Sequence, residues 1–268
     1  MLVVIRGAGD IATGIALRLH RAGLRVVMLD QPVPTSVRRT VSFSEAVRLG
    51  EMRVEGVRAR LARGAAETRS IVAAGEVAVL VDPAGESVPD LRPQVLVDAI
   101  LAKRNLGTSR DMAPVVIGVG PGFTAGPGEG SDCHAAIETQ RGHDLGRVIY
   151  EGSPAPNTGI PGNIGGHTVD RVLRAPRAGV FEPVLRIGAR VHAGDVAARV
   201  AGEPMTCAID GILRGLLQEG VPVARGMKVG DIDPRAVPGH CLTSSDKARA
   251  VGGGVLEAIC HFANGWGE

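Results

Sequence analysis

The chain has 268 residues, of which 44% are hydrophobic, and its formal net charge is +2. This length suits one large domain or two modest ones with an ample core. The near-neutral charge and an aromatic content of 2% argue against a nucleic-acid partner, because they leave neither a basic surface nor a base-stacking platform. The longest apolar runs have the length of strands, so we expect no membrane span.

Four cysteines lie far apart and form no C-x-x-C pair: Cys133, Cys207, Cys241 and Cys260. This spacing fits a reducing compartment and excludes a cysteine-cluster zinc ribbon. The first residues enter an apolar run without a basic region or a cleavage site, so we expect no export signal and a cytoplasmic protein.

Residues 2–30 predict a strand, a glycine turn, a helix and a second strand. Gly7, Gly9 and Ala12 fit the G-x-G-x-x-[G/A] pattern, and Asp30 lies near the position where an acid binds a ribose hydroxyl. This is the start of a Rossmann-like, doubly wound α/β sheet. The predicted cofactor-binding residues of this segment are Gly7, Ala8, Gly9, Asp10 and Asp30.

Asp10 complicates this interpretation, since its carboxylate would stand where phosphate oxygens lie. Asp is also a favoured N-cap, whose side chain would satisfy the N–H groups that a phosphate would otherwise take. The alternative is a βαβ unit whose glycines only make a tight turn.

The next hundred residues alternate between strand and helix patterns. After a loop at 31–40, Ser42 and Glu45 have the spacing of a capping box before a helix at 45–49. We predict one strand at 52–61, a helix at 65–74, and buried parallel strands at 77–81, 95–100 and 115–119. Asp98 ends one of these strands, and Lys103 and Arg104 follow it as candidate ligands for an anionic group. A helix cap followed by a solvated basic turn explains the same residues.

Residues 118–132 form a glycine- and proline-rich loop after a strand. Backbone N–H groups in such a loop line phosphates or cofactors, so Gly120, Gly122 and Phe123 are predicted to bind a cofactor. The loop lacks the order of a Walker motif. The alternative is a long connection between domains.

Residues 132–152 are the densest in reactive side chains, and a strand is expected at 145–150. His134 and Glu138 are four residues apart, and Arg141 and His143 follow. We name Glu138, Arg141 and His143 as catalytic candidates, and His134, Glu138 and His143 as weak metal-ligand candidates. A Glu–Arg pair and surface histidines at a hairpin are the structural alternative.

The C-terminal part contains a repeat. Residues 179–200 align with residues 211–232, and glycines match at Gly179/Gly211, Gly188/Gly220 and Gly194/Gly226. Two copies of a short β unit predict a small pseudo-twofold β-sandwich, which resembles the biotinyl/lipoyl-type barrel-sandwich hybrid. The connection at 201–210 has no lysine, so a carrier role is not expected.

The last helix is predicted from a cap at residues 244–246 to about Phe262. Gly252-Gly253-Gly254 cost it roughly 1 kcal/mol each relative to alanine, so close packing or a nearby ligand should offset them. Before it, Asp231 and Asp233 are expected to pair with arginines or to contact a cofactor.

Several motifs taken together resemble one family. RGAGDIATGIALRLHRAG, VDAILAKRN, GVGPGFTAG, HAAIETQRGHDLGRVI, NTGIPG, DGILRGLL, KVGDIDPR and SDKARAVGGGVLEAI are similar to segments of the YqeB-type maturation proteins of selenium-dependent molybdenum hydroxylases. The resemblance implies an accessory protein that works on the molybdenum site of enzymes related to xanthine and purine dehydrogenases. It also implies a hydroxylase client as partner. Residues 126–132 make the spacing in this segment longer than in the family pattern.

We therefore expect a Rossmann-like domain at 1–119, a glycine-rich loop and β segment at 120–175, a barrel-sandwich module at 176–236 and a C-terminal helix at 237–268. The favoured function is maturation of a molybdenum hydroxylase with a bound nucleotide-type cofactor, either NAD(P) or molybdenum cofactor. The alternatives are an NAD-dependent oxidoreductase and a non-catalytic docking scaffold. A homo-oligomer stays open.

Overall fold

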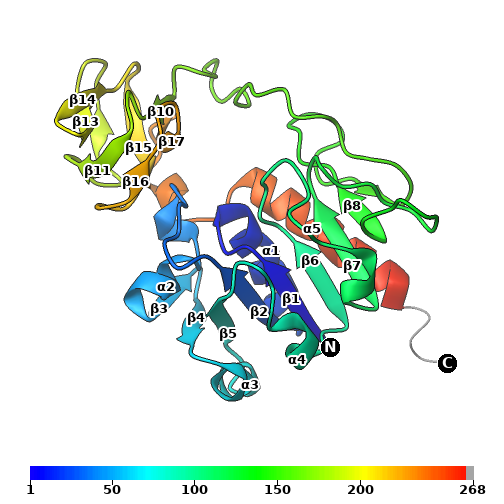
Figure 1. Ribbon diagram of the computed structural model, residues 1–268. Helices are drawn as coiled ribbons and strands as arrows, with labels where there is room; N and C mark the ends of the chain where they lie inside the picture. The colour runs from blue at the N-terminus through cyan, green and yellow to red at the C-terminus, as the bar shows by residue number, and fades with distance from the viewer. Residues whose placement is uncertain (264–268) are drawn as a thin grey trace. The chain divides into compact units, whose positions relative to one another are not determined.

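The chain divides into two compact units, and the computed structural model describes residues 1–263 (Figure 1). The first, here called the α/β unit, comprises residues 1–34, 43–158 and those from 244 onward. The second, the β unit, comprises residues 35–42 and 159–243. Residues 120–158, which the sequence sets apart by their glycine content, thus belong to the α/β unit.

The α/β unit is built on a nine-stranded mixed sheet with the order β3-β4-β5-β2-β1-β6-β7-β8-β9. Neighbouring strands from β4 to β8 are parallel, whereas β3 and β9 join the edges as antiparallel strands. The strands are β1 (Leu2–Arg6), β2 (Arg25–Asp30), β3 (Glu51–Val54), β4 (Val57–Ala62), β5 (Val77–Val81), β6 (Val95–Asp98), β7 (Val115–Val119), β8 (Ala135–Ile137) and β9 (Val148–Ile149). The unit is a mixed α/β fold, as the buried apolar runs predict.

Helices cover both faces of this sheet. On one face, Ile71 and Val88 of two helices join a buried cluster with Ala136 of β8. The next residue, Ile137, points the other way and lies against Gly254 of the last helix. The helices of the unit are α1 (Asp10–Arg21), α2 (Glu45–Leu49), α3 (Ala65–Ala73), α4 (Val88–Leu91) and α5 (Asp246–Ala263), with a 3-10 turn, η2 (Arg110–Met112).

Close packing, one of the two explanations that the sequence suggests, accounts for two of the three glycines of α5. A Cβ atom on Gly252 would lie 3.0 Å from the carbonyl oxygen of Gly14 in α1, and one on Gly254 would lie 2.2 Å from that of Gly146. Gly253 between them faces open space. Helix α5 therefore approaches α1 and the sheet more closely than any side chain would allow.

Three local predictions are wrong. The strand expected at 52–61 is a hairpin, since Glu55 and Gly56 both have positive φ and turn β3 into β4. The expected capping box is absent, because the Ser42 hydroxyl donates to the Arg38 carbonyl at 2.8 Å and Ser44 precedes α2. Of the strand expected at 145–150, only β9 forms.

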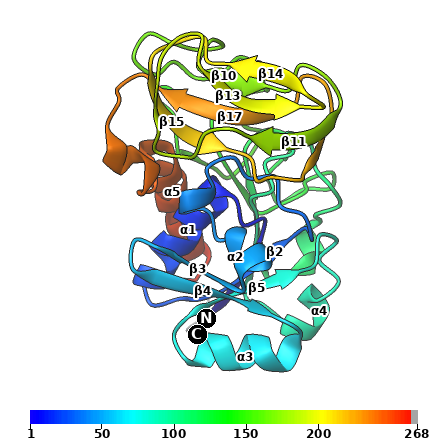
Figure 2. The same cartoon turned by 90° about the vertical axis from the view of Figure 1, so that its left-hand side faces the viewer.

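The β unit consists of two four-stranded antiparallel sheets, β10-β17-β15-β12 and β14-β13-β11-β16, around one shared buried core (Figure 2). Its strands are β10 (Val172–Arg174), β11 (Gly179–Pro183), β12 (Arg190–Val191), β13 (Val196–Val200), β14 (Glu203–Thr206), β15 (Gly211–Leu216), β16 (Pro222–Val223) and β17 (Lys228–Asp233). Two 3-10 turns, η1 (Arg39–Val41) and η3 (Pro238–Cys241), complete the unit.

The predicted repeat organises these sheets. Each strand of the first copy begins 32 residues before its counterpart: β11 and β15 at Gly179 and Gly211, β12 and β16 at 190 and 222, β13 and β17 at 196 and 228. The copies exchange their short middle strands, because β11 pairs with β16 and β12 pairs with β15. The two copies therefore cannot be separated without breaking both sheets.

A buried charge network lies on β17. Asp231 accepts hydrogen bonds from Arg171 and Arg214, and Asp233 accepts from Arg214 and Arg235. Burial alone would raise the pKa of Asp233, but the hydrogen bonds from Arg235 and the charge of Arg214 outweigh it and lower the pKa to about 2. Of the two expectations for these aspartates, the structure shows pairing with arginine.

Candidate functional site

The glycine turn after β1 lies where the strand order reverses, since β2 and β6 flank β1 on its two sides. In open α/β sheets, ligands bind at this point, outside the carboxyl ends of the strands. Gly7 has a φ of +100°, and a Cβ there would lie 2.8 Å from the Ala99 carbonyl oxygen. Gly9 is the N-cap of α1, and Asp10 is the first helical residue. Asp10 is therefore not the N-cap that the sequence allows for.

Asp30 ends β2 beside this turn. Its carboxylate accepts a hydrogen bond from the Gln31 N–H at 2.8 Å and a second from the Ala8 backbone. Burial raises the pKa of Asp30 to about 6, against these two hydrogen bonds, which lower it. An acid that is hydrogen-bonded to the glycine turn and only partly exposed is thus available for a hydroxyl donor.

Asp98 is engaged within the protein. It is 2% exposed, and its carboxylate accepts from the Thr108 hydroxyl at 2.6 Å and lies 3.6 Å from the Arg6 guanidinium. Arg6 is itself buried at the end of β1 and donates to Thr108. This network connects β1, β6 and the loop that follows β6. Asp98 therefore stabilises the framework of the candidate site through its contacts with Thr108 and Arg6.

The loop after β6 packs against the glycine-rich loop after β7. A Cβ on Gly122 would lie 2.5 Å from the Arg104 Cα, and one on Gly120 would lie 2.9 Å from the Thr139 hydroxyl. Phe123 is 4% exposed and fills the space above Gly118. These glycines therefore bring two loops of the protein together, and the Phe123 ring lies in the core.

Lys103 is an exposed residue of the same loop with a φ of +63°. Non-glycine residues with positive φ are uncommon, and backbone strain gathers at functional sites. The Lys103 ammonium donates to the Asn157 side chain at 2.8 Å. Lys103 and Arg104 therefore lie in the loop that follows the carboxyl end of β6, and Arg104 lies against Gly122.

The three catalytic candidates have different surroundings. Glu138 follows β8, is buried, and accepts from the N–H groups of Gln140 and Ala155 at 2.6 and 2.7 Å. Arg141 donates two hydrogen bonds to Asp246 of α5, at 2.8 and 3.0 Å. His143 is exposed in the turn before β9. Glu138 and Arg141 are thus held by hydrogen bonds to neighbouring segments of the α/β unit, whereas His143 lies at the surface.

His134 lies before β8, where its Nδ1 accepts a hydrogen bond from the Val116 N–H at 3.0 Å. Burial lowers the pKa of His134, and the nearby charge of Arg110 lowers it further. Among residues 1–263, no three His, Cys, Asp or Glu side chains are arranged to hold a metal ion. His134, Glu138 and His143 are therefore not brought together as a ligand set.

Lys247 is the residue that the sequence analysis misses. It lies in the first turn of α5, is only partly exposed, and interacts electrostatically with Arg141, Asp10, Lys103 and Glu138. Burial lowers the pKa of Lys247. The charges of Arg141 and Lys103 lower it further, whereas those of Asp10 and Glu138 raise it. The one available signal is composition, because the chain has only three lysines and this one follows a helix-capping sequence.

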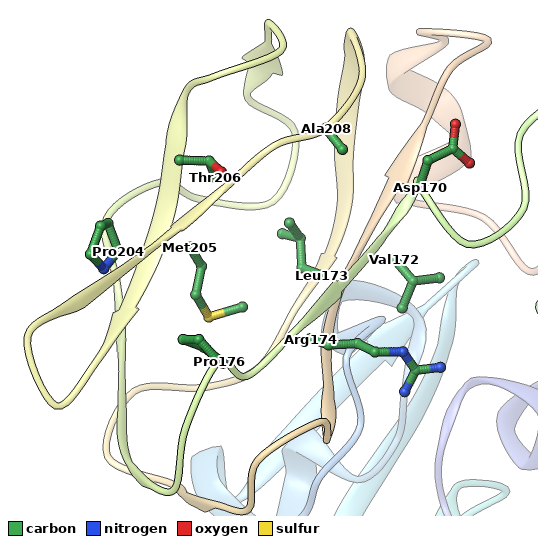
Figure 3. A pocket seen from close by; sticks show the side chains of 9 residues that line it. All are labelled: Asp170, Val172, Leu173, Arg174, Pro176, Pro204, Met205, Thr206 and Ala208. Carbon is green, nitrogen blue, oxygen red and sulfur yellow. The ribbon is translucent and has the colours of Figure 1, made fainter.

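A separate pocket of about 210 Å³ lies within the β unit, between β10 with its flanking residues and β14 with the turn that follows it. Leu173, Met205 and Pro176 point toward one another across it, with Asp170 and Arg174 at its edge (Figure 3).

Within the described residues, no helix is both long and apolar enough to cross a membrane.

No protein-family model matches the chain. It is 55% identical over 258 residues to "Uncharacterized protein YqeB" of Escherichia coli strain K12, an alignment covering 96% of this chain and 47% of that protein. The chain thus spans about half the length of the curated relative it matches.

Two solved structures show weaker similarity. A succinylglutamate desuccinylase/aspartoacylase from Rhodobacter sphaeroides is 26% identical, with 32% of this chain and 29% of that chain covered and a TM-score of 0.23. An aspartoacylase family protein from Mesorhizobium loti is 14% identical, with 86% and 84% covered and a TM-score of 0.28. At these TM-scores, neither structure informs the function of this chain.

Proposed function

We propose that this protein is an accessory factor in the maturation of a selenium-dependent molybdenum hydroxylase, and that it binds a nucleotide-bearing cofactor during assembly of the metal site. Two findings support the proposal. The chain is 55% identical to a YqeB protein over most of its length. Its motifs also resemble those of YqeB-type maturation proteins.

The structural observation that supports the proposal is that the glycine turn and Asp30 lie together at the carboxyl ends of β1 and β2, where Asp30 accepts a hydrogen bond from Ala8, while the loop that carries Lys103 follows the neighbouring strand β6. The order β5-β2-β1-β6-β7-β8 supports a Rossmann-like fold, in which a ligand lies across the reversal of strand order. There the start of α1 favours a phosphate. Asp30 accepts a ribose hydroxyl, and Lys103 and Arg104 offset phosphate charge.

These donors fit the nucleotide part of NAD(P) or of a molybdopterin dinucleotide. A bound molybdenum cofactor would supply the metal centre that the client enzyme requires. The residues of this chain would bind its phosphate and ribose groups. Glu138 contributes by holding the backbone of residues 140 and 155 in place, and Arg141 by fixing the start of α5 through Asp246.

The thiols favour cofactor handling over covalent selenium or sulfur transfer. Cys133, Cys207 and Cys241 are buried. Burial raises the pKa of Cys133 to about 12, so its thiolate is scarce at neutral pH. Only Cys260 is exposed, on α5.

The β unit is proposed as the client-docking module. Its repeat and exchanged strands are similar to a biotinyl/lipoyl-type barrel-sandwich hybrid, and its hairpin at 201–210 has no lysine for a carrier group.

An NAD-dependent oxidoreductase is the second candidate, favoured by Asp30, whose charge would repel the 2′-phosphate of NADP. It predicts steady NADH oxidation with one of a panel of small substrates. The maturation factor shows no turnover alone.

The test is native mass spectrometry of protein purified without oxygen from a host supplied with molybdenum and selenium. A bound mass of molybdopterin or its dinucleotide is expected, and Gly9→Trp should lose it. Gly128→Trp is the matched control, because Gly128 is exposed and a Cβ there meets open space. Ligand retained by Gly9→Trp would refute the assignment of the site.

A further inference from the structure

Residues 35–42 belong to the β unit, although the chain on both sides of them belongs to the α/β unit. We call this segment the strap. The chain leaves the α/β unit after β2, passes through the strap, and returns to the α/β unit at Phe43. The strap is therefore a short piece of the β unit whose two ends are anchored in the other unit.

The end that leaves the strap is bonded to the glycine turn. The Ser44 N–H donates to the Ala8 carbonyl oxygen at 2.9 Å, and the Phe43 N–H donates to the Thr13 hydroxyl at 2.8 Å. That hydroxyl in turn donates to the same Ala8 oxygen at 3.1 Å. All four residues are 0% exposed, so no solvent replaces these hydrogen bonds when they break.

The chain that enters the strap starts from the same turn. The Gly7 N–H donates to the Leu29 carbonyl oxygen at 2.7 Å. The Asp30 carboxylate accepts from the Gln31 N–H at 2.8 Å, where the chain leaves β2. Both ends of the excursion from β2 to Phe43 are therefore held by the residues of the glycine turn.

Within the β unit, the strap binds the end of β15. The Leu216 N–H donates to the Val37 carbonyl oxygen at 2.7 Å, and the Arg39 side chain donates to the Leu216 carbonyl oxygen at 2.8 Å. A Cβ on Gly215 would lie 3.1 Å from the Val37 oxygen, so the glycine permits this close approach. Strand β12 pairs with the beginning of β15, and the strap binds its end.

The strap also binds the segment through which the chain returns to α5. Arg38 is 5% exposed and donates to the carbonyl oxygens of His240 and Thr243 at 2.8 and 3.1 Å. The Thr40 hydroxyl donates to the Cys241 carbonyl oxygen. The strap therefore holds two parts of the β unit: the end of β15 and the turn η3 that precedes α5.

We infer that the strap couples the glycine turn to the β unit, so that a change at the turn alters how firmly the strap binds Leu216. The two states are the strap seated on β15 and the strap lifted from it, a local opening of the kind that links distant sites. Fixing one end of a short segment lowers the entropy cost of fixing the rest, and by linkage the coupling acts in both directions.

A ligand that orders the glycine turn would thus also tighten the strap on the β unit. The inference goes beyond the proposed function, because the coupling depends on hydrogen bonds of this chain and not on the identity of a ligand.

Amide hydrogen exchange of the full chain tests the coupling, because two neighbouring amides of the β unit report on different bonds. The Leu216 N–H is bonded to the strap, whereas the Leu217 N–H donates to the Val229 carbonyl oxygen at 2.8 Å. Thr13→Val removes the hydroxyl that holds Phe43 and keeps the shape of the side chain. The Leu216 amide should then exchange roughly 2- to 10-fold faster, the range for one lost hydrogen bond, while the Leu217 amide keeps its rate. Thr13→Ser retains the hydroxyl and should leave both rates unchanged.

A Leu216 rate that is unchanged in folded Thr13→Val overturns the inference, because nothing is then transmitted. A Leu217 rate that rises equally also overturns it, because the whole β unit is then loosened. The native mass of the anaerobically purified protein decides the proposed function separately, since neither amide rate depends on a bound cofactor.

If circular dichroism shows that Thr13→Val is unfolded, the reverse experiment decides. Arg39→Gln removes the donor from the strap to Leu216 and should speed exchange of the Phe43 amide by roughly 2- to 10-fold. Arg174→Gln is the matched control, because its guanidinium donates to the Gly226 carbonyl oxygen at 2.9 Å, in the β unit but outside the strap. A Phe43 rate that is equal in Arg39→Gln and in the wild type refutes the coupling.

Discussion

Replacing Asp30 by Asn is expected to stabilise the α/β unit at neutral pH and to weaken ligand binding. Unfolded, the carboxyl ionises at its ordinary value of 3.8, whereas burial raises the pKa in the folded unit to about 6. As the pH rises, the unfolded chain therefore releases this proton at a lower pH than the folded unit does. The free energy of unfolding consequently falls between pH 3.8 and about pH 6. A difference of about two pKa units corresponds to roughly 3 kcal/mol at pH 7 and above.

An asparagine side chain carries no charge at any of these pH values, and its amide oxygen still accepts from the Ala8 and Gln31 backbone. The Asp30→Asn variant should thus be more stable than the wild type by up to about 3 kcal/mol at pH 8 and equally stable near pH 3.5. Hydrogen exchange of the β1 and β2 amides at several pH values measures this, because it reports the α/β unit separately from the β unit.

Asp82 is the control, since it directly follows the neighbouring strand β5. Burial raises the pKa of Asp82, but hydrogen bonds from Ser87, Glu86 and Gly85 outweigh it and lower the pKa. Asp82→Asn should therefore destabilise the unit at pH 7, opposite in sign to Asp30→Asn. An Asp30→Asn variant that is less stable than the wild type at pH 8, or a difference that persists at pH 3.5, would refute the role of burial.

Three further outcomes follow from the packing, the charges and the thiols. Gly253→Ala should stabilise α5 by up to ~1 kcal/mol, while Gly254→Ala should destabilise it, because only the Cβ added at residue 254 would collide with the backbone of Gly146. Thermal unfolding measures both effects, and equal melting temperatures of the two variants would contradict this. Asp231→Asn should lower the free energy of unfolding of the β unit by about 3–5 kcal/mol, because it leaves the charges of buried arginines uncompensated. Hydrogen exchange of the β17 amides measures this, and a loss below ~1 kcal/mol would contradict it. Iodoacetamide at pH 8 should modify Cys260 in the native protein and spare Cys133, because Cys133 is buried and its pKa is raised to about 12. Intact mass with peptide mapping measures this, and modification of Cys133 would contradict the protection by burial.

Local sequence pattern determined most of the secondary structure. The β-branched runs at 77–81, 95–100 and 115–119 contain buried strands, the second of which ends at Asp98, because a parallel sheet needs apolar side chains on both faces. The repeat in the C-terminal part predicted matching strands 32 residues apart, since each glycine takes the same backbone conformation in both copies. The helix at 45–49 forms as predicted, although its capping box does not, and at 52–61 the pattern of a single strand concealed a hairpin.

The composition of the site was decided by tertiary structure. Asp98 is a candidate ligand residue in the sequence, but Arg6 and Thr108, which belong to other segments of the chain, enclose it. Lys247 stands over a hundred residues from the other candidate residues, and only the packing of α5 on α1, where Ala248 and Gly252 both lie against Gly14, brings the first turn of α5 to α1. Spacing along a chain determines which side chains share a helix or a strand, whereas burial and charge compensation between distant segments arise only when those segments pack.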